Sequence, residues 1–104
     1  MVLYEVNLRV AAGIAEEFDA WLMPHVAEML TCPGFQKARR WVRLDPPEAE
    51  APSVWWTVHY EVDSMASLQA YFDGPAARMR GDGLTRFGGR FDATRRGLES
   101  SGGD

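Results

Sequence analysis

The sequence contains a single cysteine, Cys32, and no apolar run approaching the roughly 20 residues that span a membrane as a helix. One cysteine excludes a disulfide within the chain and favours a reduced, cytoplasmic setting. The first residues alternate like a strand and lack the basic and apolar segments of a signal peptide. We therefore expect a cytoplasmic protein that does not enter a membrane.

Positive charge is also scarce, since 11 Lys and Arg stand against 15 Asp and Glu, for a net charge of −4. This balance argues against nucleic acid or an anionic membrane as a partner. Two separate histidines and one cysteine form no recognisable metal-binding set. The glycines of residues 87–90 match neither the Walker pattern nor the Rossmann glycine spacing, and they precede a strand. They therefore predict a turn. We expect no metal and no cofactor.

What is present is enough apolar material for one small core, because 46% of the residues are hydrophobic and 12% are aromatic. A length of 104 residues suits one domain and is too short for two. We place that domain at residues 1–99 and expect the polar tail, residues 100–104, to be disordered.

The hydrophobic period changes several times along the chain. Strict alternation predicts strands at residues 2–10, 35–44, 54–62 and 88–98, whereas i, i+4, i+7 spacing predicts helices at residues 14–30 and from residue 64 onward. Gly74-Pro75 should divide the second helix, and the proline-rich residues 45–52 should form a long hairpin loop. The order βαββαβ predicts an α+β, ferredoxin-like fold with a four-stranded antiparallel sheet and the helices on one face.

The helices can cover only one face of such a sheet, and alternation assigns the residues of the other. That face should carry Glu5, Asn7, Arg9, Phe35, Lys37, Arg39, Trp41, Arg43, Trp55, Thr57, His59, Glu61, Asp92, Thr94 and Arg96. Two indoles are too many for a wholly solvated face, and so many charges do not suit a fully buried one. We therefore expect a homodimer in which two such faces meet around a polar space with aromatic walls.

A family resemblance leads to the same architecture. The segments Trp21-Leu22, His25 to Leu30 and Pro33-Gly34-Phe35 resemble the helix-to-strand signature of the dimeric α/β-barrel superfamily. That superfamily includes antibiotic-biosynthesis monooxygenases and stress-responsive barrel proteins. Residues 84–91 and 2–6 resemble a narrower bacterial family of unknown function within it. The chain departs from the pattern at Ala27, where relatives carry proline, and at Gly74-Pro75 and Gly83. The narrow family has no agreed catalytic set to transfer.

The two histidines are the candidate catalytic residues, and each has a structural alternative. His25 lies within the apolar stripe of the first helix, where a half-buried structural histidine is the favoured interpretation over an acid or base. His59 points to the uncovered face, near Glu5 or Asn7 if the first and third strands pair. It is either a base or one member of a polar cross-strand pair.

The remaining candidates would bind a small, partly aromatic ligand. They are Glu5, Asn7, Arg39, Trp41, Trp55, Thr57 and Arg96. Trp41 and Trp55 could equally be anchors of the dimer interface. The basic and aromatic run of residues 37–43 raises RNA binding as an alternative, but residues 53–60 lack the required strand motif.

Three functions remain open at this stage. The first is a homodimeric protein that binds a small ligand. The second is a cofactor-independent monooxygenase, isomerase or cyclase with His59 or His25 as base, in which Asn7 or Arg96 would polarise a carbonyl. The third is a dimeric interaction module without a ligand.

Overall fold

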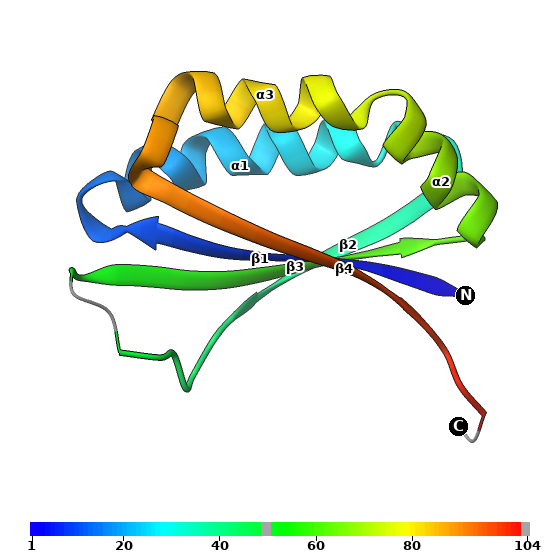
Figure 1. Cartoon of the computed structure of the whole chain (residues 1–104), viewed down its shortest axis with the longest axis horizontal. Helices are drawn as coiled ribbons and strands as arrows, with labels where there is room; N and C mark the ends of the chain where they lie inside the picture. Colours follow the sequence, from blue (N-terminus) through cyan, green and yellow to red (C-terminus); the bar gives the residue numbers. More distant parts are fainter. Residues whose placement is uncertain (49–50, 103–104) are drawn as a thin grey trace.

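The computed structural model describes residues 1–48 and 51–102 and contains a four-stranded antiparallel sheet with helices on one side (Figure 1). The strands are β1 (Val2–Ala11), β2 (Phe35–Val42), β3 (Ser53–Val62) and β4 (Phe91–Glu99). The helices are α1 (Ala15–Met29), α2 (Met65–Asp73) and α3 (Ala76–Phe87), with short 3-10 turns at Ala12–Ile14 and Gly88–Arg90. The predicted α+β, ferredoxin-like fold is confirmed.

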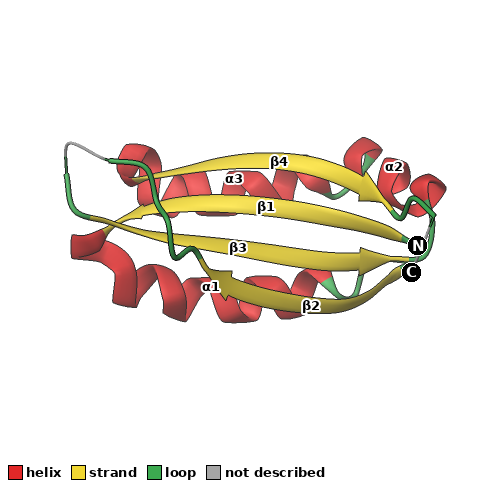
Figure 2. Cartoon of the chain, turned by 90° about the horizontal axis from the view of Figure 1, so that it is seen from below, coloured by secondary structure: helices red, strands yellow, loops and turns green. Residues whose placement is uncertain are grey.

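The strands lie in the order β2-β3-β1-β4, so β1 and β3 occupy the centre of the sheet (Figure 2). All three pairings are antiparallel. Seen from below in Figure 2, the sheet is in front and the helices lie behind it. We call the face that the helices leave uncovered the open face.

The core lies between the sheet and the helices. Val2, Tyr4, Leu8 and Val10 of β1 are buried there, as the alternation of β1 predicts. The helices contribute buried side chains that include Phe18, Leu22, Met29, Leu68 and Met79. The buried residues therefore form one core on one side of the sheet.

The helix boundaries follow local chemistry. α1 continues through Pro24, while Gly74-Pro75 separates α2 from α3 as predicted. The Ser64 side chain caps α2 by accepting a hydrogen bond of 3.2 Å from the backbone N–H of Ser67. Gly83, unusual in the sequence, lets α3 pack closely on α1 and β4, because an added Cβ would lie 3.0 Å from the Trp21 ring and 3.3 Å from the Phe91 ring.

The alternation rule assigned the faces of β1, β3 and β4 correctly but failed at the start of β2. Phe35 is buried in the core, where its ring lies 5.8 Å from that of Tyr60, and not on the open face. The pairing of β2 with β3 shifts by one residue between Phe35 and Lys37. This bulge reverses the face of every residue before it.

The predicted loop at residues 45–52 connects β2 to β3. Its first residues lie on the open-face side of the sheet in Figure 1. Residues 49–50 of this loop and residues 103–104 of the predicted tail lie outside the described part of the chain. Within that part, no helix is long and apolar enough to cross a membrane.

Candidate functional site

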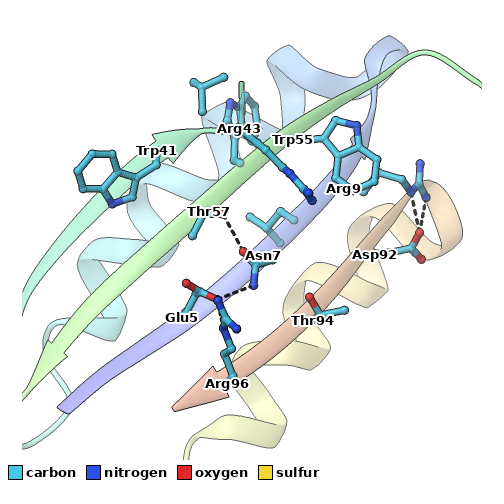
Figure 3. A pocket seen from close by; sticks show the side chains of 13 residues that line it. Glu5, Asn7, Arg9, Trp41, Arg43, Trp55, Thr57, Asp92, Thr94 and Arg96 are labelled. Atoms are coloured by element: carbon cyan, nitrogen blue, oxygen red, sulfur yellow. Dashed lines mark hydrogen bonds and ion pairs between the residues drawn. The ribbon is translucent and has the colours of Figure 1, made fainter. Parts of the chain in front are cut away.

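The open face contains a hollow of about 520 Å³ over β1, β3, β4 and the end of β2 (Figure 3). Trp41 and Trp55 stand on either side of β3 and form its aromatic walls. Its size lies within the range of about 300–1,000 Å³ typical of small-molecule sites. The other lining residues are Glu5, Asn7, Leu8, Arg9, Val42, Arg43, Trp56, Thr57, Asp92, Thr94 and Arg96.

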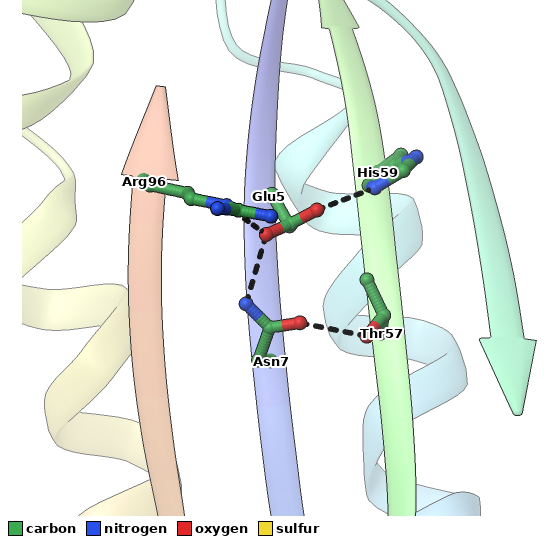
Figure 4. Close-up of polar contacts among 5 residues, drawn as sticks. All are labelled: Glu5, Asn7, Thr57, His59 and Arg96. Atoms are coloured by element: carbon green, nitrogen blue, oxygen red, sulfur yellow. Dashed lines mark hydrogen bonds and ion pairs between the residues drawn. The ribbon is translucent and has the colours of Figure 1, made fainter. Parts of the chain in front are cut away.

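A network of hydrogen bonds centred on Glu5 lies at one end of the hollow (Figure 4). Glu5 Oε2 accepts from Asn7 Nδ2 at 3.0 Å and from Arg96 Nε, while Glu5 Oε1 lies 2.9 Å from His59 Nε2. Asn7 Oδ1 in turn accepts from Thr57 Oγ1 at 2.7 Å. Strand register explains the cluster, because Glu5 stands opposite both His59 and Arg96.

The Glu5 carboxylate stays ionised although only 6% of the residue is exposed. Burial raises its pKa, but the hydrogen bonds from Arg96, Asn7 and His59 together outweigh burial and lower it to about 2. Glu5 is therefore an acceptor at neutral pH and holds three donors in place.

This network also determines which nitrogen of His59 carries a proton. An ionised carboxylate can only accept, so His59 must donate through Nε2–H to Glu5. When the ring is neutral, its other nitrogen, Nδ1, is left as an acceptor. His59 does not itself line the hollow but contacts Glu5, which does, and its ring lies 6.1 Å from that of Trp41, measured between ring centroids. This arrangement resembles a base held by an acid partner.

Both indole walls carry arginines. The Arg39 guanidinium lies 4.4 Å from the centre of the Trp41 ring, and that of Arg43 lies 5.9 Å from the Trp55 ring. Arg39 does not itself line the hollow, whereas Arg43 does. Arg39 therefore supports a wall, and Arg43 faces the interior.

The opposite end of the hollow is closed by an ion pair between β1 and β4. Arg9 Nε and Nη2 each lie 2.7 Å from Asp92 Oδ2, and Arg9 Nη1 donates to Ser53 Oγ at 3.3 Å. Both charges are thus already paired with each other, which leaves them less available to a ligand.

His25 lies on the other side of the sheet. Its ring stacks on that of Trp21 at 4.5 Å, in the layer between α1, α3 and the sheet. Burial there lowers its pKa. The two candidate histidines are therefore not members of one site, and only His59 belongs to the open face.

The predicted ligand residues converge on this face, and several others join them. Glu5, Asn7, Trp41, Trp55, Thr57 and Arg96 line the hollow, as do Arg9, Arg43, Asp92 and Thr94, which alternation had placed on this face without a role. Strand order could have singled out Arg9, Asp92 and Thr94, because Arg9 stands opposite Asp92 and Asn7 stands opposite Thr94. Within the described residues, no three ligating side chains group as a metal site would require.

Solved structures with the same arrangement of strands and helices define the class of the protein as ferredoxin-like α+β. A candidate antibiotic biosynthesis monooxygenase from Deinococcus radiodurans superimposes with a TM-score of 0.74 at 14% identity, covering 100% of this chain and 96% of that one. SnoaB, a cofactor-independent oxygenase from Streptomyces nogalater, gives 0.66 at 12% identity, with coverages of 98% and 95%. An ethyl tert-butyl ether D (EthD) family protein from Bacillus halodurans gives 0.64 at 19% identity, with coverages of 97% and 100%.

The chain belongs to a family described as a domain of unknown function, DUF4286, whose model matches residues 1–101. No curated protein matches the sequence. The predicted membership of a family of unknown function is confirmed, and the solved structures share the predicted fold. At identities below 20%, these structural matches establish the shared fold alone. The function therefore has to be argued from the site.

Proposed function

We propose that this protein binds a small, partly aromatic molecule in the hollow of the open face, and that a second copy of the chain closes the hollow. The hollow carries this proposal, since its two indole walls stand over a floor of polar groups that are already hydrogen-bonded to one another. Apolar walls with a few fixed polar groups are what small-molecule sites provide.

Exposed apolar groups on the same face support the second copy. Trp41 is 44% exposed and Leu98, at the far end of β4, is 37% exposed. Leu98 stands opposite Leu3, which also points to the open face. Covering these groups with an identical face would remove their apolar area from water and enclose the ligand.

NMR of the indole N–H groups tests where an aromatic ligand binds, because the four tryptophans divide between the two sides of the sheet. We expect 2-naphthol to shift the signals of Trp41 and Trp55 and to leave Trp21, in the helix layer, unchanged. Trp55→Leu should weaken binding by about tenfold, as the loss of a stacking partner does. Met23→Leu, a change on an exposed site of α1, is the control. Movement of the Trp21 signal alone would place the site elsewhere.

A second candidate is a cofactor-independent oxygenase, isomerase or cyclase on the same face. The ordered contact between Glu5 and His59, which leaves Nδ1 as acceptor, favours it. The fold shared with an oxygenase that needs no cofactor is consistent with this candidate. Oxygen uptake with a panel of phenols and hydroquinones tests the oxygenase, and product analysis tests the isomerase or cyclase, which consume no oxygen. Turnover should be lost in His59→Gln and kept in His25→Gln, and activity that survives His59→Gln would exclude that base.

A further inference from the structure

The charges around the hollow are unevenly paired, and this indicates which ligand it selects. Five charged residues from the described part of the chain line it, and four of them form two pairs, Arg9 with Asp92 and Arg96 with Glu5. Arg43 is the fifth. Its contact is Asp45, at 3.4 Å between Nε and Oδ1, where the two side chains are 47% and 92% exposed.

Such an exposed pair contributes little, so Arg43 can exchange Asp45 for a ligand at small cost. Figure 3 shows the Arg43 side chain extending over β3 between the indoles of Trp41 and Trp55. Its guanidinium lies 5.9 Å from the centre of the Trp55 ring, within reach of a ligand that packs on that indole. A guanidinium suits a carboxylate especially well, because it can donate two parallel hydrogen bonds.

The acceptors of the Glu5 network already hold donors from the protein, whereas Arg43 has only its long, exposed contact with Asp45. Both oxygens of Glu5 hold donors from the protein, and Asn7 Oδ1 holds the Thr57 hydroxyl. A cationic ligand would therefore find the Glu5 carboxylate occupied, and Asp92 already pairs with Arg9 through Oδ2. The guanidinium groups of Arg39 and Arg43 already lie against the Trp41 and Trp55 rings, so these rings are poor binding sites for a cation.

We infer that the hollow selects a planar aromatic anion, such as an aromatic carboxylate, with its ring between Trp41 and Trp55 and its negative group on Arg43. This inference rests on the proposed function, because it specifies the ligand class of the same site. It makes Arg43 the specificity-determining residue. The local positive charge is notable in a protein whose net charge is −4.

Calorimetric titration of the full chain with three matched probes tests the inference. The probes are 2-naphthoate, the neutral 2-naphthamide and the cationic 2-naphthylmethylammonium. We expect naphthoate to bind about tenfold more tightly than naphthamide, as a charge-assisted hydrogen bond predicts, and the ammonium compound to bind most weakly.

Variants at Arg43 then locate the effect. Arg43→Gln should reduce naphthoate binding to the level of naphthamide, and Arg43→Lys should keep part of the preference. Lys37→Gln is the matched control, because it removes one positive charge on the same face from β2, the strand that leads into Arg43, without lining the hollow. It should preserve the preference for naphthoate.

The outcomes separate this inference from the proposed function. Equal binding of naphthoate and naphthamide would overturn the anion preference and leave an aromatic binding site in place. A preference for naphthoate that survives Arg43→Gln but disappears in Lys37→Gln would overturn the role of Arg43. Absence of binding by all three probes would contradict both proposals.

Discussion

Glu5 is the one charged residue that is buried within the described part of the chain, and its neighbours explain why it remains charged. Alternation alone predicted its face, and pairing of the first and third strands predicted His59 as a neighbour. The contribution of Arg96 required knowing that β4 lies on the other side of β1. The sequence therefore predicted which residues share the open face. The strand order was needed to show that Glu5 lies between His59 and Arg96.

The network makes stability depend on pH in one direction. The folded pKa of Glu5, about 2, lies below its ordinary value of 4.5, so the stabilisation is complete above about pH 4.5 and is lost as pH falls towards 2. Urea unfolding of wild type should therefore show a loss of a few kcal/mol over this range, and Glu5→Gln should show a smaller one. Glu61→Gln, which leaves the Glu5 network intact, should retain the full loss. An equal loss in wild type and Glu5→Gln would contradict this account.

At the scale of elements, the turn from α1 into β2 sets the register of an edge strand. Gly34 adopts φ of +87°, and Asp63 N–H donates to Gly34 O at 2.9 Å, which ties the turn to the end of β3. The bulge that follows places Phe35 in the core and Lys37 on the open face. A period-2 pattern cannot reveal a bulge, and for this reason the sequence assigned Phe35 to the wrong side.

Gly34→Ala should therefore destabilise the protein by about 1–3 kcal/mol, through a left-handed backbone and a steric clash. The added Cβ would lie 2.5 Å from the Cβ of Ser67. Thermal or urea unfolding measures the change. Gly13→Ala is the matched control, since its Cβ would meet nothing within 4 Å. Equal stabilities for the two variants would show that the turn is not constrained as described.

At the scale of the whole molecule, the helices cover one side of the sheet, and the other side combines a hollow with exposed apolar groups. Sequence predicted this asymmetry, because two amphipathic segments cannot cover both faces of four strands. It could not predict the hollow, because the hollow depends on which residues stand opposite each other in neighbouring strands. Trp41 of β2 stands opposite Thr57 of β3, and Arg9 of β1 stands opposite Trp55 of β3. Those contacts depend on register.

The central claim is that the open face is the functional face and that a second copy covers it. Sedimentation velocity at micromolar concentration tests this most directly, with two variants that each add one charge. Wild type should sediment as a dimer, and Leu98→Asp on the open face should weaken the dimer by about tenfold or more. Leu84→Asp, on the helix layer and 58% exposed, should leave it intact. A monomeric wild type, or a dimer disrupted by Leu84→Asp and not by Leu98→Asp, would contradict the account.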